Sequence, residues 1–167
     1  GCPVGSKSTK SGKNIWCGDF FHDDERYPIG VDFVVGNPPW GSIAIEGTPA
    51  ATWCEAQEPP LEIPDKQIAA AFVLKAPRHA SATGQLCLVL PHGTLFNLNA
   101  VDFQRELFSK FAVDRILNLA DYQRFLFEEA GHPAVVIVYR PTPPSSKRHA
   151  IDYWAPKVDW MVMRAEV

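Results

Sequence analysis

VDFVVGNPPW, residues 31–40, is the stretch that decides the fold. Its first part is a short apolar run, rich in β-branched residues and stopped by prolines, which is typical of a buried strand rather than a helix. Pro38 and Pro39 then fix two consecutive backbone φ angles and supply no N–H group. We therefore expect a buried strand that ends in a rigid turn offering only carbonyl acceptors.

Alternating strands and helices are expected on either side of this stretch. The further strands are predicted at residues 85–90, 113–119 and 134–140, with short ones near residues 13–21 and 151–154. Helices are predicted at 66–76, capped by Asp65, and at 100–111, opened by Asn97 or Asn99. Residues 41–64 hold no period, so we expect a loop there, either a functional lid or plain surface.

This alternation predicts an α/β sheet with helices on its faces. Ligands of such sheets bind beyond the carboxyl ends of the strands, and residues 37–40 fall at such an end. The length of 167 residues suits one compact domain.

Composition excludes several classes of protein. No run of 18 apolar residues exists, so we expect no membrane span. The four cysteines form no CxxC pair, which favours free thiols and a cytoplasmic location. The histidines show no ligand spacing with them, so no metal site is expected. The net charge of −3 is unlike that of a strong nucleic-acid binder. Most of the affinity for any DNA would therefore come from other parts of the protein.

The turn after the strand has the chemistry to hold an amino group attached to an aromatic ring. Asn37 supplies a side-chain carbonyl and Pro38 a backbone carbonyl, while Trp40 supplies a flat stacking face. The lone pair of such an amino group is delocalised, and two acceptors would stabilise the positive charge that develops when it attacks. The flat face would hold a base flipped out of its helix.

VDFVVGNPPWG resembles motif IV of the N6-adenine DNA methyltransferases, which reads Asp, Asn or Ser, then Pro-Pro, then an aromatic residue. The likeness is strongest to the large enzymes of restriction–modification systems. GDFF at residues 18–21 resembles motif III, GQLCLVLPHGTLFN resembles motifs V to VII, and LFEEAGHPAVVIVYRP resembles motif VIII. The resemblance covers roughly residues 13–144. It implies a partial S-adenosylmethionine-dependent methyltransferase sheet of Rossmann-like type.

The resemblance also implies roles for single residues. Asn37, Pro38, Pro39 and Trp40 would form the catalytic turn, with no metal. Asp19 and Phe20 would contact the adenine of S-adenosylmethionine. Trp40 and Phe127 would stack on the flipped adenine of double-stranded DNA, with Phe125 as the alternative to Phe127.

One departure from the family concerns motif I, the glycine-rich turn that wraps the methionine part of the cofactor. None of the glycines before residue 37 forms it, so the chain is expected to be an N-terminally truncated and by itself inactive fragment. Residues 1–144 would be the catalytic-side part of the domain, and 145–167 an extension. An open sheet edge should follow and invite self-association.

Two other functions remain open at this point. The same turn would serve a methyltransferase acting on a protein glutamine or an RNA guanine, since each offers a planar amino group. Alternatively, the chain is a non-catalytic binding fragment.

Overall fold

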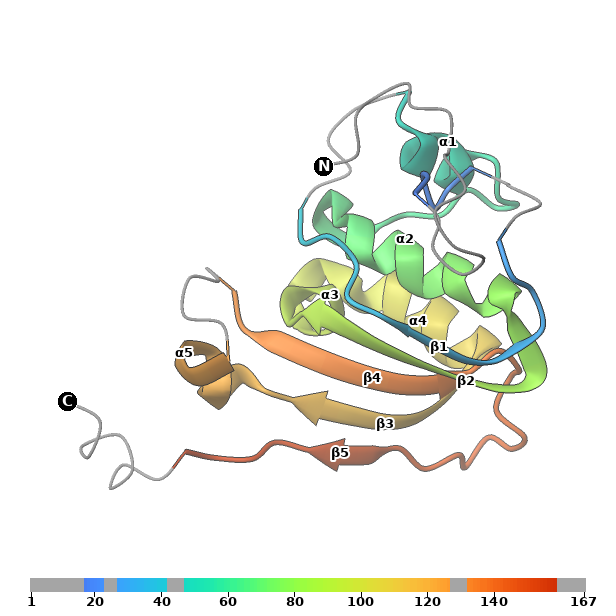
Figure 1. Ribbon diagram of the computed structural model, residues 1–167. Helices are drawn as coiled ribbons and strands as arrows, with labels where there is room; N and C mark the ends of the chain where they lie inside the picture. The colour runs from blue at the N-terminus through green and yellow to red at the C-terminus, as the bar shows by residue number, and fades with distance from the viewer. Residues whose placement is uncertain (1–16, 23–26, 42–46, 127–131, 159–167) are drawn as a thin grey trace.

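A five-stranded sheet organises the computed structural model, which describes residues 17–22, 27–41, 47–126 and 132–158. The strands lie in the order β1-β2-β4-β3-β5, and β4 alone runs antiparallel to its neighbours (Figure 1). Their bounds are β1 Val31–Gly36, β2 Ala80–Pro91, β3 Ala112–Asn118, β4 Ala134–Arg140 and β5 Asp152–Trp154. The predicted α/β class and the strand predicted at residues 134–140 are confirmed.

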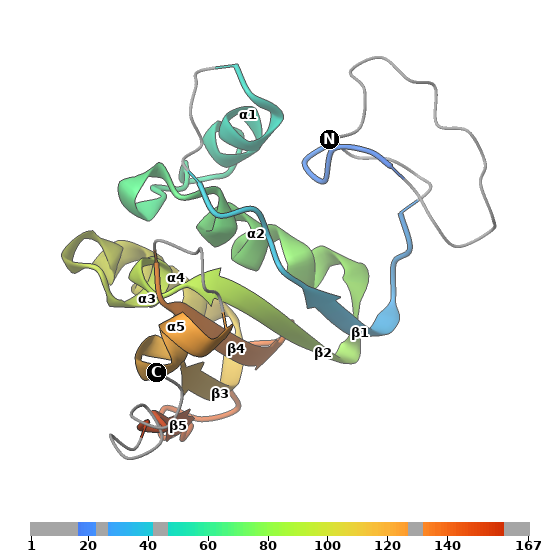
Figure 2. The ribbon, with the colours of Figure 1, turned by 60° about the vertical axis from the view of Figure 1, so that its left-hand side comes forward.

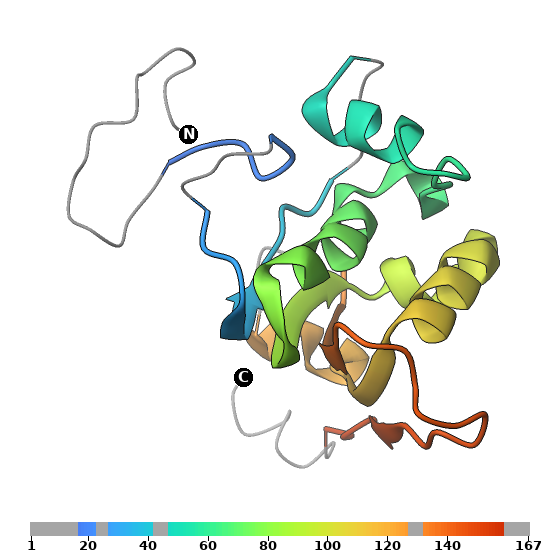
Figure 3. The ribbon, with the colours of Figure 1, turned by 90° about the vertical axis from the view of Figure 1, so that its right-hand side faces the viewer.

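A layer of helices covers one face of this sheet (Figures 1 and 3). It consists of α1 Pro49–Glu55, α2 Ile68–Lys75, α3 Gly93–Phe96 and α4 Val101–Lys110, joined in places by the 3-10 turns Pro64–Lys66, Ala76–His79 and Leu98–Ala100. After β3, the turn Ala120–Tyr122 leads into α5 Gln123–Leu126, which buries none of its residues and lies beyond the end of that strand (Figure 1). α2 and α4 supply fully buried side chains such as Val73 and Leu107. The buried Tyr139 hydroxyl of β4 donates to the Val73 carbonyl at 2.8 Å, which joins α2 to the middle of the sheet.

The pairing of β1 with β2 sets the position of the residues that follow β1. The two strands are parallel, with Gly36 opposite Leu88. Near the start of the pair, a Cβ at Gly84 would lie 2.8 Å from the Val31 carbonyl oxygen, so only glycine allows this approach. Because β1 and β2 run the same way, residues 37–40 emerge at the same sheet edge as the end of β2.

β1 is one of the two edge strands of the sheet among the described residues, and β5 is the other (Figure 2). Phe33 and Val35 point away from the helices and are 71% and 78% exposed. Val34, between them, packs against the core instead. This open edge with exposed apolar side chains is what the sequence led us to expect.

Residues 41–64 differ from the irregular loop that was predicted. α1 forms within them, and the Thr48 side chain caps it by accepting from the Ala51 N–H at 3.3 Å. Trp53 and Ala50 of α1 are buried. The helix is stabilised by these tertiary contacts, which local periodicity does not reveal.

Asp65 was wrongly predicted to cap α2. It adopts a positive φ of 48° inside the turn Pro64–Lys66, and α2 begins after Gln67 without a side-chain cap. The Asp65 carboxylate instead accepts hydrogen bonds from the side chains of Asn97 and Asn99. Asn97 does cap the turn Leu98–Ala100, by accepting from the Leu98 N–H at 2.9 Å.

The cysteines follow the prediction only in part. Cys54 and Cys87 are free thiols, whereas Cys17 is disulfide-bonded. Burial, with the nearby Glu55 carboxylate, raises the pKa of the Cys54 thiol to about 11, so it stays protonated at neutral pH. None of the helices in the described ranges has the length and apolar character needed to cross a bilayer.

Candidate active site

The turn Asn37–Pro38–Pro39–Trp40 directly follows β1, as predicted. Pro38 is buried, whereas Asn37 and Pro39 are exposed at the sheet edge. The turn is tied to the helical layer because the Ile68 N–H at the start of α2 donates to the Gly41 carbonyl at 2.9 Å. Two rigid prolines and this bond hold Asn37 at the end of the strand with little freedom.

The first and last side chains of the turn contact each other. The Trp40 indole N–H donates to the Asn37 Oδ1 at 3.0 Å. Since an indole N–H can only donate, the amide atom that faces it is the oxygen. The orientation of the Asn37 amide is therefore set by its neighbour three residues on.

A second turn, residues 17–22, carries the predicted cofactor residues. The Asp19 Oδ1 accepts the Phe21 N–H at 2.8 Å, which fixes the carboxylate against its own backbone. The Tyr27 hydroxyl donates to the Asp19 carbonyl at 3.0 Å. A Cβ at Gly18 would lie 2.6 Å from that hydroxyl, so the glycine permits the close packing of Tyr27 on the turn.

An aromatic cluster joins this second turn to α2. The Phe20 ring stacks on Phe72 with centroids 4.4 Å apart and planes 10° apart, and Phe21 meets Phe72 edge-on at 4.9 Å. The Lys75 ammonium is buried and lies 5.6–5.9 Å from the ring centroids of Phe20, Phe21 and Trp53. These contacts hold the Asp19 carboxylate at a fixed place beside α2.

A cavity of about 620 Å³ lies between the two turns. Asp19 and Phe20 line it from one side, and Pro39 lines it from the other. The rest of its wall comes from α1, α2 and the 17–22 turn: Gly18, Phe21, Thr48, Pro49, Ala50, Ile68 and Phe72. The structure thus brings together two groups of residues that are about 20 positions apart in the sequence. The volume of the cavity is in the range of small-molecule and cofactor sites.

His92 lies at the same sheet edge, where β2 ends. Its ring stacks on Phe96 at 4.5 Å, and its Nε2 is 3.4 Å from the Asn118 side-chain nitrogen. Asn118 Nδ2 also donates to the Tyr153 hydroxyl at 2.7 Å. Burial lowers the pKa of His92, which favours a neutral imidazole at physiological pH. These contacts make His92 a packed side chain at the end of β2.

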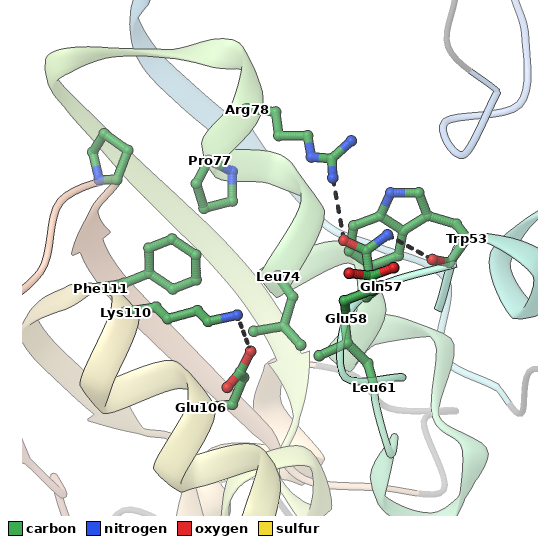
Figure 4. A pocket seen from close by; sticks show the side chains of 11 residues that line it. Trp53, Gln57, Glu58, Leu61, Leu74, Pro77, Arg78, Glu106, Lys110 and Phe111 are labelled. Atoms are coloured by element: carbon green, nitrogen blue, oxygen red, sulfur yellow. Dashed lines mark hydrogen bonds and ion pairs between the residues drawn. The ribbon is translucent and has the colours of Figure 1, made fainter. Parts of the chain in front are cut away.

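A second cavity, of about 340 Å³, lies between the end of α1, the end of α2 and α4 (Figure 4). The Arg78 guanidinium stacks over Trp53 at 5.4 Å and donates to the Gln57 side chain at 3.2 Å. On α4, which lies across the cavity from Arg78, Lys110 forms an ion pair with Glu106. No predicted site residue lines this cavity, and the charges of these two side chains are engaged with neighbours. We therefore place the candidate site in the larger cavity.

Phe127, the predicted stacking residue, lies outside the described residues. Of the short strand predicted near residues 13–21, residues 13–16 also lie outside them, and residues 17–21 form a turn and no strand. Phe125 is 42% exposed and its ring lies 6.2 Å from Tyr122. Across the described ranges, no three His, Cys, Asp or Glu side chains gather in a way that could hold a metal ion.

The comparison with known families covers most of the chain. A sequence profile for the family described as N-6 DNA Methylase matches residues 7–152. The chain belongs to the N-6 DNA Methylase family. No protein with a curated description matches it significantly.

Solved structures share the fold of this methylase chain. One is a modification subunit assigned to a type I restriction enzyme of Vibrio vulnificus, with a TM-score of 0.58 and 20% identity over 78% of the chain. The methyltransferase subunit of a type I restriction-modification system from Streptococcus thermophilus has a TM-score of 0.54 and 22% identity over 77% of the chain. A protein assigned to the class I S-adenosylmethionine-dependent methyltransferases of Listeria monocytogenes has a TM-score of 0.61 and 13% identity over 87% of the chain. The methylase chain spans only 26%, 26% and 43% of these three chains, in that order.

Sequence reasoning missed several residues of the methylase cavity. Ile68 and Phe72 of α2 pack against the core and also line the cavity. Thr48, Pro49 and Ala50 were missed because α1 was not predicted. The signal for α1 was available as a threonine followed by a proline, which is a typical helix start.

Proposed function

We propose that this chain takes part in transferring a methyl group from S-adenosylmethionine to the N6 amino group of adenine in DNA, within a restriction–modification system. The observation that carries the proposal is the cavity that Asp19 and Phe20 line together with Pro39, the third residue of the strand-end turn. Membership of the N-6 DNA Methylase family gives the same reaction independently of this geometry. The subunits named above, from restriction enzymes, supply the biological setting.

The residues of the cavity fit the adenosine part of the cofactor. Phe20, Phe72 and Ile68 offer apolar surface for a flat ring, and Asp19 offers a carboxylate fixed by its bond to the Phe21 N–H. A carboxylate at the rim of an apolar slot suits a ligand with both N–H or O–H donors and an aromatic ring. When bound, the cofactor supplies an electrophilic methyl group on a sulfonium.

The turn after β1 would act on the acceptor amino group. Asn37 Oδ1 and the Pro38 carbonyl would accept its two N–H groups, which favours a pyramidal nitrogen with an available lone pair. The bound cofactor would supply the methyl group, with the sulfonium sulfur as leaving group, and the nitrogen would then release one proton to solvent. Both acceptors are held by the rigid turn before reaction, so no reorganisation is needed as positive charge develops on the nitrogen.

The direct test is methyl transfer. The chain, and any longer natural polypeptide that contains it, is incubated with DNA and S-adenosylmethionine carrying a labelled methyl group, and the nucleosides are analysed. Label on N6 of adenine supports the proposal. Label on another base, or no label, with a longer polypeptide that binds the cofactor contradicts it.

Replacing Asp19 should weaken cofactor binding. We expect Asp19→Ala to raise the calorimetric dissociation constant for S-adenosylmethionine by roughly 10- to 100-fold, because a hydrogen bond to a charged group is lost. Asp32→Ala removes an exposed carboxylate of β1 that does not line the cavity, and it should leave binding unchanged. Equal binding by the Asp19→Ala and unaltered chains would mean that the cofactor lies elsewhere.

DNA is the proposed partner, and the charge of the chain limits how it binds. At a net charge of −3, the chain carries no overall attraction for phosphates. We therefore assign to this chain the flipped base and the cofactor, and assign most backbone contacts to other parts of the enzyme.

We also propose that the chain self-associates through the edge at β1. Phe33 and Val35 are exposed there, and the open backbone of an edge strand is a template for pairing. Val35→Lys should shift the chain towards the monomer in sedimentation velocity at about 50 μM, because a charged side chain on an edge strand opposes pairing. Leu98→Lys replaces an apolar side chain that is 91% exposed outside the sheet and should have no such effect. A monomer before substitution would contradict the proposal.

A further inference from the structure

We propose that Trp40 is a positioning residue whose indole N–H orients the Asn37 amide for catalysis, in addition to any stacking by its ring. The inference rests on the proposed function. It starts from the 3.0 Å hydrogen bond between Trp40 Nε1 and Asn37 Oδ1.

The need for such a device follows from the shape of the amide. The two ends of the Asn37 side chain are nearly equal in size but opposite in hydrogen bonding, since one is an acceptor and the other a double donor. If the amide turned over, its NH₂ group would face the amino group of the substrate, and donor would meet donor. Asn37 is exposed, so packing does not fix which way the amide faces.

The Trp40 indole resolves this ambiguity. Its N–H only donates, so it stabilises the orientation with the oxygen towards it and disfavours the reversed one. A carbonyl oxygen has two lone pairs, so Oδ1 can accept from the indole and still accept from a substrate amino group. Because Pro38 and Pro39 separate the two residues, the distance between their backbones is also fixed.

Trp40 is next to the cavity in sequence but is not one of the residues that line it. Pro39 lines the cavity, while neither Asn37 nor Trp40 does. Loss of the indole N–H should therefore change the chemical step and leave cofactor affinity unaltered. Phenylalanine keeps a flat aromatic ring at this position and removes only the N–H and part of the stacking area.

The first experiment needs no activity. Trp40→Phe identifies the Trp40 indole N–H signal among the five tryptophans in a ¹H–¹⁵N correlation spectrum. In Asn37→Ala that signal should move and its exchange with solvent should speed by about tenfold, as expected for one lost hydrogen bond. An unchanged signal and exchange rate would overturn the inference.

The second experiment is a double-mutant cycle on methyl transfer. Trp40→Phe should lower kcat by roughly fivefold to tenfold, the value of one hydrogen bond, with the cofactor dissociation constant within about twofold of the starting value. In an Asn37→Asp background both side-chain oxygens are acceptors and no orientation is needed, so the same substitution should lower kcat by less than about twofold. The loss of stacking area is common to both backgrounds and cancels.

The outcomes separate this inference from the proposed function. Equal losses in the two backgrounds would overturn the positioning role and leave the methyltransferase proposal intact. Absence of methyl transfer to adenine, with the hydrogen bond present in the spectrum, would overturn the proposed function and with it the catalytic meaning of the bond.

Discussion

Asn37→Ala should lower the rate of methyl transfer to adenine by about 10²–10³-fold while the affinity for S-adenosylmethionine stays the same. The magnitude is that of removing one preorganised hydrogen-bonding group from a site where charge develops. The loss should appear in kcat, because the charge on the acceptor nitrogen exists in the transition state and not in the bound substrate. Single-turnover incorporation of a labelled methyl group measures it.

The fold should survive this substitution, since Asn37 is exposed and lies after the end of β1. Asn99→Ala is the matched control, because it also removes an exposed asparagine. Asn99 lies in the turn before α4, and its side chain donates a hydrogen bond to Asp65. It should transfer methyl groups at the unaltered rate. If Asn37→Ala retained more than about a tenth of the rate, the turn would not hold the reacting nitrogen.

Phe103→Ala should destabilise the chain by about 3–5 kcal/mol, the usual cost of deleting a buried aromatic ring. Phe103 lies on α4 and is 2% exposed, in the core that joins the helices to the sheet. Since a domain of this size is stable by only about 5–15 kcal/mol, this loss is a large share of the total. Urea denaturation followed by circular dichroism gives the free energy of unfolding.

Val101→Ala on the same helix serves as the control, because Val101 is 54% exposed. It should change the free energy of unfolding by less than about 1 kcal/mol. Similar losses for the two variants would show that α4 does not pack on the sheet as described.

The strands were the most predictable part of the fold, for a local reason. Residues 134–140 were predicted as a strand and form β4 with the same bounds, because a run of β-branched residues favours a strand wherever it is buried. The antiparallel direction of β4 is known only from its pairing with β2 and β3, since no residue of β4 by itself encodes it. β2 begins at Ala80, five residues before the predicted strand, because its pairing with β1 extends it.

The helices were less predictable where tertiary contacts determine whether a helix forms. α2 and α4 each carry an apolar stripe, and both formed close to the predicted residues. α1 has only seven residues, too few to be stable alone, and forms through the burial of Ala50, Trp53 and Cys54. Asp65 looked like a helix cap, yet its partners are side chains more than 30 residues away.

The sequence by itself determined the rigid turn: a β-branched run followed by Asn37, two prolines and Trp40 dictates a strand end with carbonyl acceptors, because proline fixes φ and removes donors. The cavity was decided only in the tertiary structure. Asp19 and Pro39 face it together because α2 holds one turn through the Phe20–Phe72 stack and the other through the Ile68–Gly41 hydrogen bond. The orientation of the Asn37 amide was likewise decided in three dimensions, since it depends on where the Trp40 indole lies.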